Sequence, residues 1–193
     1  MQSRLLAAML AALPLAAGSA VFPAAALAES PAFTGPAIGS PAVYGALQTS
    51  DGAAADMAAL AGEKGTVIAF FRSADWCPFC KKQLKELEDA KAPLTEQGWN
   101  LVAISYDAPE TLAAFAGKNS ISYPLLSDPG SETIKAFNLL NTDMKPGSRA
   151  YGIPYPAIVF VGADGAVKTV LQEEGYKVRP TNEAVIEAAA ALQ

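Results

Sequence analysis

Histidine is absent from this 193-residue chain, and cysteine occurs only twice. A structural zinc site usually takes four Cys or His ligands, so the sequence predicts no metal centre. The usual serine and cysteine hydrolases need a histidine base, and this chain has none. Without histidine and with only two cysteines, the chain is limited to chemistry that a pair of thiols performs without a cofactor.

Positive charge is also scarce, because 14 lysines and arginines stand against 19 acidic residues, for a formal net charge of −5. A mildly acidic chain without a basic stripe is a poor candidate for binding nucleic acid or anionic lipid. Beyond the N-terminal segment, no stretch is apolar enough to cross a membrane, so we expect no stable membrane association.

The N-terminal segment has the pattern of a secretory signal peptide. Arg4 precedes an apolar stretch at 5–17, and the small-x-small triplet 26–28 precedes Glu29. We therefore predict a signal peptide at 1–28, cleaved after Ala28, and a periplasmic protein. The alternative is an uncleaved membrane anchor, but prolines and a glycine interrupt the stretch, which falls short of the roughly 20 apolar residues of a span.

The two cysteines stand three apart, in the pentapeptide Trp-Cys-Pro-Phe-Cys at 76–80. They follow the apolar run 66–71 and begin a Lys/Leu/Glu-rich segment with helical spacing. A helix N-terminus at Cys77 favours a thiolate, because its free N–H groups and macrodipole stabilise negative charge. A purely structural disulfide is the alternative, but so short a loop removes little entropy from the unfolded chain.

The remaining pattern alternates between strands and helices, which predicts an α/β fold with a mixed central sheet flanked by helices. We expect an extended lead-in at 29–41 and one domain at 42–193. Pro93 is expected to kink or end the helix that starts at Pro78. The other predicted elements are a short strand at 46–49, a helical turn at 57–60, strands at 66–71, 99–106, 123–126, 157–161 and 166–171, a hairpin turn at 162–165, and helices at 109–118, 131–137 and from Thr181 or Asn182 to 192.

The stretch 70–81 resembles the thioredoxin-like redoxins of the alkyl hydroperoxide reductase/thiol-specific antioxidant superfamily. The segments 123–128 and 156–161 support the likeness, which covers roughly 36–190. It implies a thioredoxin-like three-layer sandwich, with Cys77 as the open nucleophile and Cys80 as the more covered resolving thiol. Pro156 matches the family's cis-proline beside the substrate, with Tyr155 in front of it, and Pro154 is the competitor for that role.

This chain departs from the family pattern at several positions. Where thioredoxins carry a buried acid it has Phe70 or Phe71, so that proton acceptor is missing. Peroxiredoxins place a hydroxyl residue three before the reactive Cys and a proline four before that, where this chain has Ala74 and Phe70. Ser73 is one place off. The absence of histidine disfavours the copper-delivery proteins that share the fold.

Around the cysteines, three cations are candidates for lowering the thiol pKa: Arg72, Lys81 and Arg149. Asp75 opposes them, because a nearby carboxylate disfavours the thiolate. We expect substrates to contact Trp76, Pro78 and Phe79, together with Tyr155 and Pro156. Trp76 serves equally well as packing over the first helical turn.

The sequence thus predicts a periplasmic thiol–disulfide oxidoreductase acting through Cys77 and Cys80. Its partners would be protein or small thiol and disulfide substrates, with a separate electron donor or acceptor. A thiol-dependent peroxidase is the alternative enzyme, and a binding module with a structural disulfide is the alternative outside enzymes.

Overall fold

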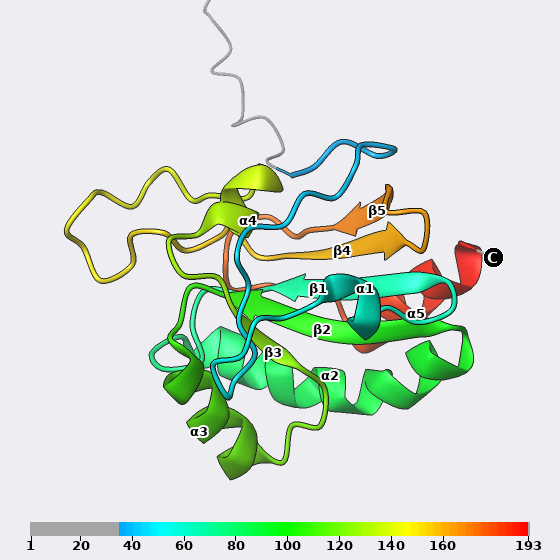
Figure 1. The fold of residues 1–193 in the computed structure, drawn as a ribbon, viewed down its shortest axis with the longest axis horizontal. Coiled ribbons are helices and arrows are strands. Elements are labelled where there is room, and N and C mark those ends of the chain that lie inside the picture. The colour runs from blue at the N-terminus through cyan, green and yellow to red at the C-terminus, as the bar shows by residue number, and fades with distance from the viewer. Residues whose placement is uncertain (1–34, 193) are drawn as a thin grey trace, which may run out of the picture. The chain divides into compact units, whose positions relative to one another are not determined.

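A computed structural model describes residues 35–192 of the chain. The predicted signal peptide at 1–28 and the first part of the predicted lead-in lie outside the described residues. The elements are α1 (Met57–Leu60), β1 (Gly65–Phe70), α2 (Pro78–Glu96), β2 (Trp99–Ser105), α3 (Pro109–Asn119), β3 (Leu125–Ser127), α4 (Glu132–Ala136), β4 (Ala157–Gly162), β5 (Val167–Leu171) and α5 (Asn182–Ala191) (Figure 1).

The five strands form one sheet in the order β3-β2-β1-β4-β5. β1, β2 and β3 run parallel, because α2 and α3 provide the crossovers that parallel neighbours require. β4 and β5 are antiparallel, joined by the turn predicted at 162–165. The predicted mixed sheet with flanking helices is confirmed.

Helices cover both faces of the sheet, and each face has its own apolar core. On β1, Val67 and Ala69 pack into the cluster that contains the buried residues of α2, α3 and α5. Ile68 and Phe70 point the other way, toward Met57 of α1 and Ile134 of α4. The alternation follows from the two-residue period of a strand, and burial on both faces explains why this run is apolar throughout.

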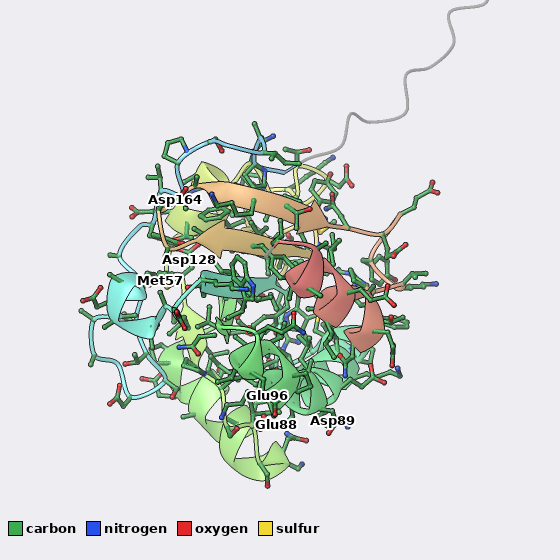
Figure 2. The ribbon with its side chains drawn as sticks, turned by 90° about the vertical axis from the view of Figure 1, so that its right-hand side faces the viewer. Met57, Glu88, Asp89, Glu96, Asp128 and Asp164 are labelled. Atoms are coloured by element: carbon green, nitrogen blue, oxygen red, sulfur yellow. A yellow bond between two sulfur atoms is a disulfide. The ribbon has the colours of Figure 1, made fainter. Side chains whose placement is uncertain are left out.

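Helix α2 begins at Pro78 and carries its charged residues outward, while Gln83 is buried. Figure 2 shows Glu88, Asp89 and Glu96 of this helix together at the lower side of the molecule. Pro93 does not end the helix, since α2 continues to Glu96, and the predicted alternative of a kink stays a prediction. Pro93 lies in the last turns, where only one intrahelical hydrogen bond is lost, and the fully buried Leu94 anchors the helix beyond it.

The chain before α1 is attached to the sheet by backbone hydrogen bonds. The amides of Gly39 and Ala42 donate to the carbonyls of Val167 and Gly165, both at 2.8 Å. Gln48 forms isolated bridges with Ala54 and Ser127 where a short strand was predicted. The end of the predicted lead-in at 29–41 is therefore paired beside β5.

Candidate active site

The two cysteines lie where β1 ends and α2 begins. Cys77 is the N-cap of α2, Pro78 is its first helical residue, and the Sγ of Cys77 accepts the amide N–H of Cys80 at 3.3 Å. Proline suits this position because its missing N–H would have no helical partner there. The two cysteines form a disulfide, with Cα atoms 5.3 Å apart.

Neither sulfur is open to solvent in this disulfide form. Cys77 is 1% exposed and Cys80 0%, so the predicted contrast between an open and a covered cysteine is not found. Both belong to the apolar cluster beneath α2, which also takes in parts of Trp76 and Phe79. Attack on either sulfur therefore requires the surrounding side chains or loop to move.

A buried carboxylate, Asp107, fixes the loop that leads to the cysteines. Its Oδ1 accepts the Ser73 hydroxyl at 2.8 Å, and its Oδ2 accepts the Ala74 amide at 2.7 Å and the Ser105 hydroxyl at 2.9 Å. The Ser73 hydroxyl in turn accepts the amides of Asp75 and Trp76, at 3.0 and 3.4 Å. One side chain from the end of β2 thus organises the backbone just before Cys77.

Burial raises the pKa of Asp107 above its ordinary value, although its three hydrogen bonds act in the opposite direction. The sequence pattern did not single out Asp107, and the positions where thioredoxins carry a buried acid hold Phe70 and Phe71 here. A signal was present, because Asp107 directly follows a predicted strand, and parallel strands bring their carboxyl ends to one edge.

A second set of contacts ties the outer side of this loop to the segment before β4. The indole N–H of Trp76 donates to the Tyr106 hydroxyl at 3.0 Å, which donates to the Arg149 carbonyl at 2.7 Å. The Arg149 guanidinium forms an exposed ion pair with Asp75. Arg149 therefore neutralises Asp75, and no contact joins it to a sulfur among the described residues, so its predicted direct action on the thiol is not found.

Arg72 lies between two aromatic rings rather than against a carboxylate. Its guanidinium carbon is 5.1 Å from the ring centroid of Trp76 and 4.2 Å from that of Tyr176. Tyr176 also meets Phe79 edge to face, with centroids 5.8 Å apart. The segment 172–180, between β5 and α5, is thereby joined to the start of α2.

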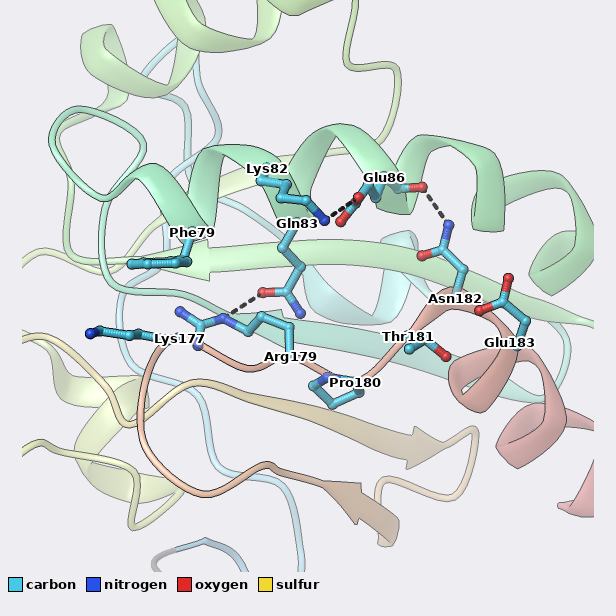
Figure 3. A pocket seen from close by; sticks show the side chains of 10 residues that line it. All are labelled: Phe79, Lys82, Gln83, Glu86, Lys177, Arg179, Pro180, Thr181, Asn182 and Glu183. Atoms are coloured by element: carbon cyan, nitrogen blue, oxygen red, sulfur yellow. Dashed lines mark hydrogen bonds and ion pairs between the residues drawn. The ribbon is translucent and has the colours of Figure 1, made fainter.

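That segment also brings Arg179 to the second cysteine, a contact that nothing in the sequence indicated. Its Nη2 lies 3.6 Å from the Sγ of Cys80. Arg179 forms one wall of a pocket of about 330 Å³ between α2 and the start of α5, which Phe79, Lys82, Gln83 and Lys177 also line (Figure 3). Lys81 faces a different hollow, with Asp75 and Phe115.

The predicted substrate residues before β4 also lie near this edge. Ala157 pairs with Phe70, which places Pro156 beside the first residue of the cysteine loop. The Tyr155 amide donates to the Leu139 carbonyl at 2.7 Å. The predicted cis bond at Pro156 is wrong, because no peptide bond within 35–192 is cis. A proline only reduces the preference for trans and does not reverse it.

A sequence profile described as the AhpC/TSA family matches residues 38–170. The chain belongs to the AhpC/TSA family. The match includes both cysteines, Asp107 and the segment around Pro156, while Arg179 and α5 lie beyond it. The resemblance stated from the stretch 70–81 is confirmed.

Relatives of this AhpC/TSA protein include both peroxiredoxins and a protein named as a thiol-disulfide oxidoreductase. A Mycobacterium tuberculosis protein named "putative peroxiredoxin" is 33% identical over 121 residues, 63% of this chain and 75% of the relative. The thiol-disulfide oxidoreductase ResA of Halalkalibacterium halodurans is 28% identical over 102 residues, 52% of this chain and 56% of the relative. The protein is accordingly an oxidoreductase that works through thiols.

The fold of this AhpC/TSA protein also matches solved structures. The crystal structure of peroxidoxin BcpB from Mycobacterium tuberculosis superimposes with a TM-score of 0.66 at 23% identity, over 81% of this chain and 96% of that one. The thioredoxin-like fold predicted from the sequence is thus confirmed. In the part of the chain that the structure describes, no helix is long and apolar enough to span a bilayer, and no three His, Cys, Asp or Glu residues cluster as a metal site.

Proposed function

We propose that this protein is a thiol–disulfide oxidoreductase whose Cys77–Cys80 pair alternates between disulfide and dithiol. The observation that carries the proposal is the disulfide within the first turn of α2, where Cys77 receives an amide N–H. A disulfide between residues three apart forms and opens with movement of the first turn of α2 and its loop only. The helix N-terminus stabilises the thiolate that results.

In the reducing direction the reaction takes two exchange steps. The Cys77 thiolate attacks one sulfur of a substrate disulfide and releases the other sulfur as a thiolate, which gives a mixed disulfide. The Cys80 thiolate then attacks the Sγ of Cys77 and expels the substrate's second thiolate. The substrate gains two electrons and the protein loses two, so a dithiol donor must restore it. The oxidising direction is the reverse of both steps.

Hydrogen bonding around the loop favours exchange over peroxide reduction. Fast cleavage of a peroxide needs donors aimed at the charge that develops on its oxygens. The position three before Cys77 is Ala74, which offers no hydroxyl, and the neighbouring Ser73 hydroxyl uses its proton on Asp107 and both lone pairs on amides. Neither residue provides a donor at Cys77.

A thiol-dependent peroxidase is the second candidate, favoured by the peroxiredoxin relatives and by Arg179 beside Cys80. A cysteine thiolate would attack the peroxide, take one oxygen as sulfenic acid and release the alcohol or water. The other thiol would then displace water to form the disulfide, which an external dithiol reduces.

Protein thiols and disulfides are the proposed substrates, since Pro78 is exposed and Trp76, Phe79 and Tyr155 are only half-buried around the cysteines. We place the protein in the periplasm on the pattern of residues 1–28, with cleavage after Ala28. Disulfides form and persist in the periplasm, so a thiol–disulfide oxidoreductase would find protein substrates in that compartment.

Trapping of mixed disulfides tests the two roles. Cys80→Ser is expected to accumulate a mixed disulfide through Cys77, because the resolving thiol is gone, whereas Cys77→Ser traps little. Trapping is scored by non-reducing electrophoresis and mass spectrometry after incubation with a model disulfide peptide. Equal trapping by both variants would overturn the assignment of roles, and no trapping by either would favour a structural disulfide.

Rapid mixing of the reduced protein with a peptide disulfide and, separately, with hydrogen peroxide separates the two enzyme functions. Aliquots are alkylated at set times and the oxidised fraction is measured by mass. We expect exchange to be fast and the peroxide reaction to match a free thiolate of the same pKa. Peroxide reduction orders of magnitude faster than exchange would make the protein a peroxidase.

A further inference from the structure

The guanidinium of Arg179 is held in place on three sides. Its Nε donates to the Oε1 of Gln83 on α2 at 3.1 Å, and its Nη1 donates to the carbonyls of Tyr176 and Val178 in its own segment. The remaining nitrogen, Nη2, reaches the Sγ of Cys80. Figure 3 shows the bond to Gln83 at the pocket wall. Hydrogen bonds to α2 and to the segment 172–180 therefore hold the guanidinium of Arg179 against the sulfur of Cys80.

Arg179 and Arg72 have no carboxylate partner among the described residues. The ion pairs there join Lys82 to Glu86, Arg149 to Asp75 and Lys168 to Asp164. Burial lowers the pKa of Arg179 to about 10, and the positive charge of Arg72 adds to this effect. Two half-buried cations thus lie close enough to repel each other, and one of them, Arg179, contacts a disulfide that is uncharged and cannot neutralise it.

We propose that Arg179, supported by Arg72, stabilises the thiolate of Cys80 once the disulfide is opened. This inference rests on the proposed function and assigns the second cysteine its own charge partner, separate from the helix terminus that serves Cys77. An opposite charge within about 4–6 Å favours the ionised form of an acid, and the pre-fixed guanidinium needs no rearrangement to supply it.

The two exchange steps both benefit from this contact. When an external thiolate attacks Cys77 of the oxidised protein, Cys80 is the leaving group, and a thiol of lower pKa leaves faster. When Cys80 resolves a mixed disulfide, a larger thiolate fraction supplies more nucleophile. Because only the reduced form carries the anion, Arg179 also makes the disulfide easier to reduce.

Other charges surround the pair and are part of the expected titration. The loop before α2 carries Arg72 and Asp75, and Asp107 follows β2. On α2 the nearest cations in sequence are Lys81 and Lys82, and the segment before α5 adds Tyr176 and Lys177. Lys177 lines the same pocket as Arg179, but in the described part of the chain it makes no hydrogen bond to Cys80, which makes it a suitable control.

The test measures the pKa of the Cys80 thiol by thiolate absorbance in protein that carries Cys77→Ser, so that Cys80 is the only thiol. Adding Arg179→Gln is expected to lower the thiolate fraction about tenfold at a pH below the midpoint, since one such charge shifts a pKa by about one or more. Arg179→Lys should restore part of the fraction, and Lys177→Gln should leave it nearly unchanged. An unchanged fraction in Arg179→Gln would overturn the inference.

A second measurement uses the intact cysteine pair in equilibrium with glutathione. Arg179→Gln should favour the disulfide about tenfold, which corresponds to about 30 mV for a two-electron couple. If Arg179→Gln does not fold, Arg72→Gln, which removes none of the hydrogen bonds that Arg179 makes, should shift both readouts in the same direction. A null result in Arg72→Gln would then reject the shared role. Neither readout needs a physiological substrate, so the inference can fail while the proposed function stands, and the reverse also holds.

Discussion

Two buried aspartates follow neighbouring parallel strands. Comparing them distinguishes a carboxylate that stabilises the fold from one that also positions the cysteine loop. Asp107 comes after β2 and accepts hydrogen bonds from Ser73, Ala74 and Ser105. Asp128 comes after β3 and accepts the amides of Thr133 and Ile134 at 3.1 and 2.8 Å. Burial raises the pKa of both carboxyls.

The difference lies in what each carboxylate holds. Asp128 satisfies amides five and six residues ahead and so starts the short helix α4, a local role. Asp107 holds a loop 33 and 34 residues earlier in the chain, and that loop leads into Cys77. A buried aspartate after β3 therefore stabilises the fold locally, whereas the buried aspartate after β2 positions the loop that carries Cys77.

Replacing each aspartate by asparagine is the sharpest way to break the comparison. Asp107→Asn and Asp128→Asn should each lower the free energy of unfolding by about 1–3 kcal/mol, because an amide cannot accept every hydrogen bond and leaves a buried donor unpaired. Only Asp107→Asn should slow reduction of the disulfide by dithiothreitol, by about tenfold, since small misplacements of reacting groups are costly.

Urea unfolding of the oxidised proteins gives the stabilities, and alkylation at set times gives the reduction rates. Equal slowing in both variants would show that lost stability, and not loop position, governs the rate.

Two buried serines extend the comparison at smaller scale. Ser73→Ala removes the hydroxyl that links Asp107 to the loop amides, and Ser131→Ala removes a hydroxyl that donates to the Gly152 carbonyl at 2.7 Å. We expect each to lower the free energy of unfolding by about 1 kcal/mol. Ser73→Ala alone should alter the reduction rate, and the same two assays decide this.

Asp107 and Asp128 should change the free energy of unfolding in the same direction as the pH rises. A pKa raised by burial means that the folded protein binds the proton more tightly than the unfolded chain. The stabilising contribution is therefore complete below the unfolded pKa and is lost as pH rises through the raised folded pKa. Subtracting the stability of Asp107→Asn from that of the wild type, measured by urea unfolding across acidic pH, should give a difference that declines as pH rises. A difference that grows with pH would contradict the burial argument.

The exposed ion pair at the active-site loop should have the smallest effect. Arg149→Gln breaks the pair with Asp75, and Lys168→Gln breaks the pair between β5 and Asp164 in the β4–β5 turn, whose cation is less exposed. Each should change the free energy of unfolding by at most about 1 kcal/mol, because water screens both charges. A larger loss in Arg149→Gln, measured by urea unfolding at low and high salt, would mean that this pair holds the loop together with Asp107.

The sequence predicted those features whose causes are local. The apolar run at 66–71, the proline after Cys77 and the turn at 162–165 each have a short-range signature, and the structure contains all three elements. Asp107 and Arg179 were missed because their partners lie far away in the chain, and a lone acid after a strand or a lone arginine in a loop has no periodicity.

The helix end predicted at Pro93 and the cis bond predicted at Pro156 failed for a different reason. Each rests on what proline permits, and the alternative of a kink at Pro93 stays a prediction. The packing of Leu94 continues the helix, and the ordinary preference for trans sets the bond before Pro156.

The two tryptophans lie at opposite ends of the parallel strands. Because of this separation, the intrinsic fluorescence of the protein can report the redox state of the cysteine pair. Trp76 adjoins the disulfide at the carboxyl end of β1, whereas Trp99 starts β2, fully buried and edge to face with Phe160, with ring centroids 5.4 Å apart. The length of the strand, about 20 Å at roughly 3.3 Å per residue, separates them. A disulfide quenches the fluorescence of a neighbouring indole, so the emission of Trp76 should follow the redox state, and that of Trp99 should change only when the core unfolds. In a Trp99→Phe variant, the remaining emission would record each turnover of the cysteine pair in real time without an added dye.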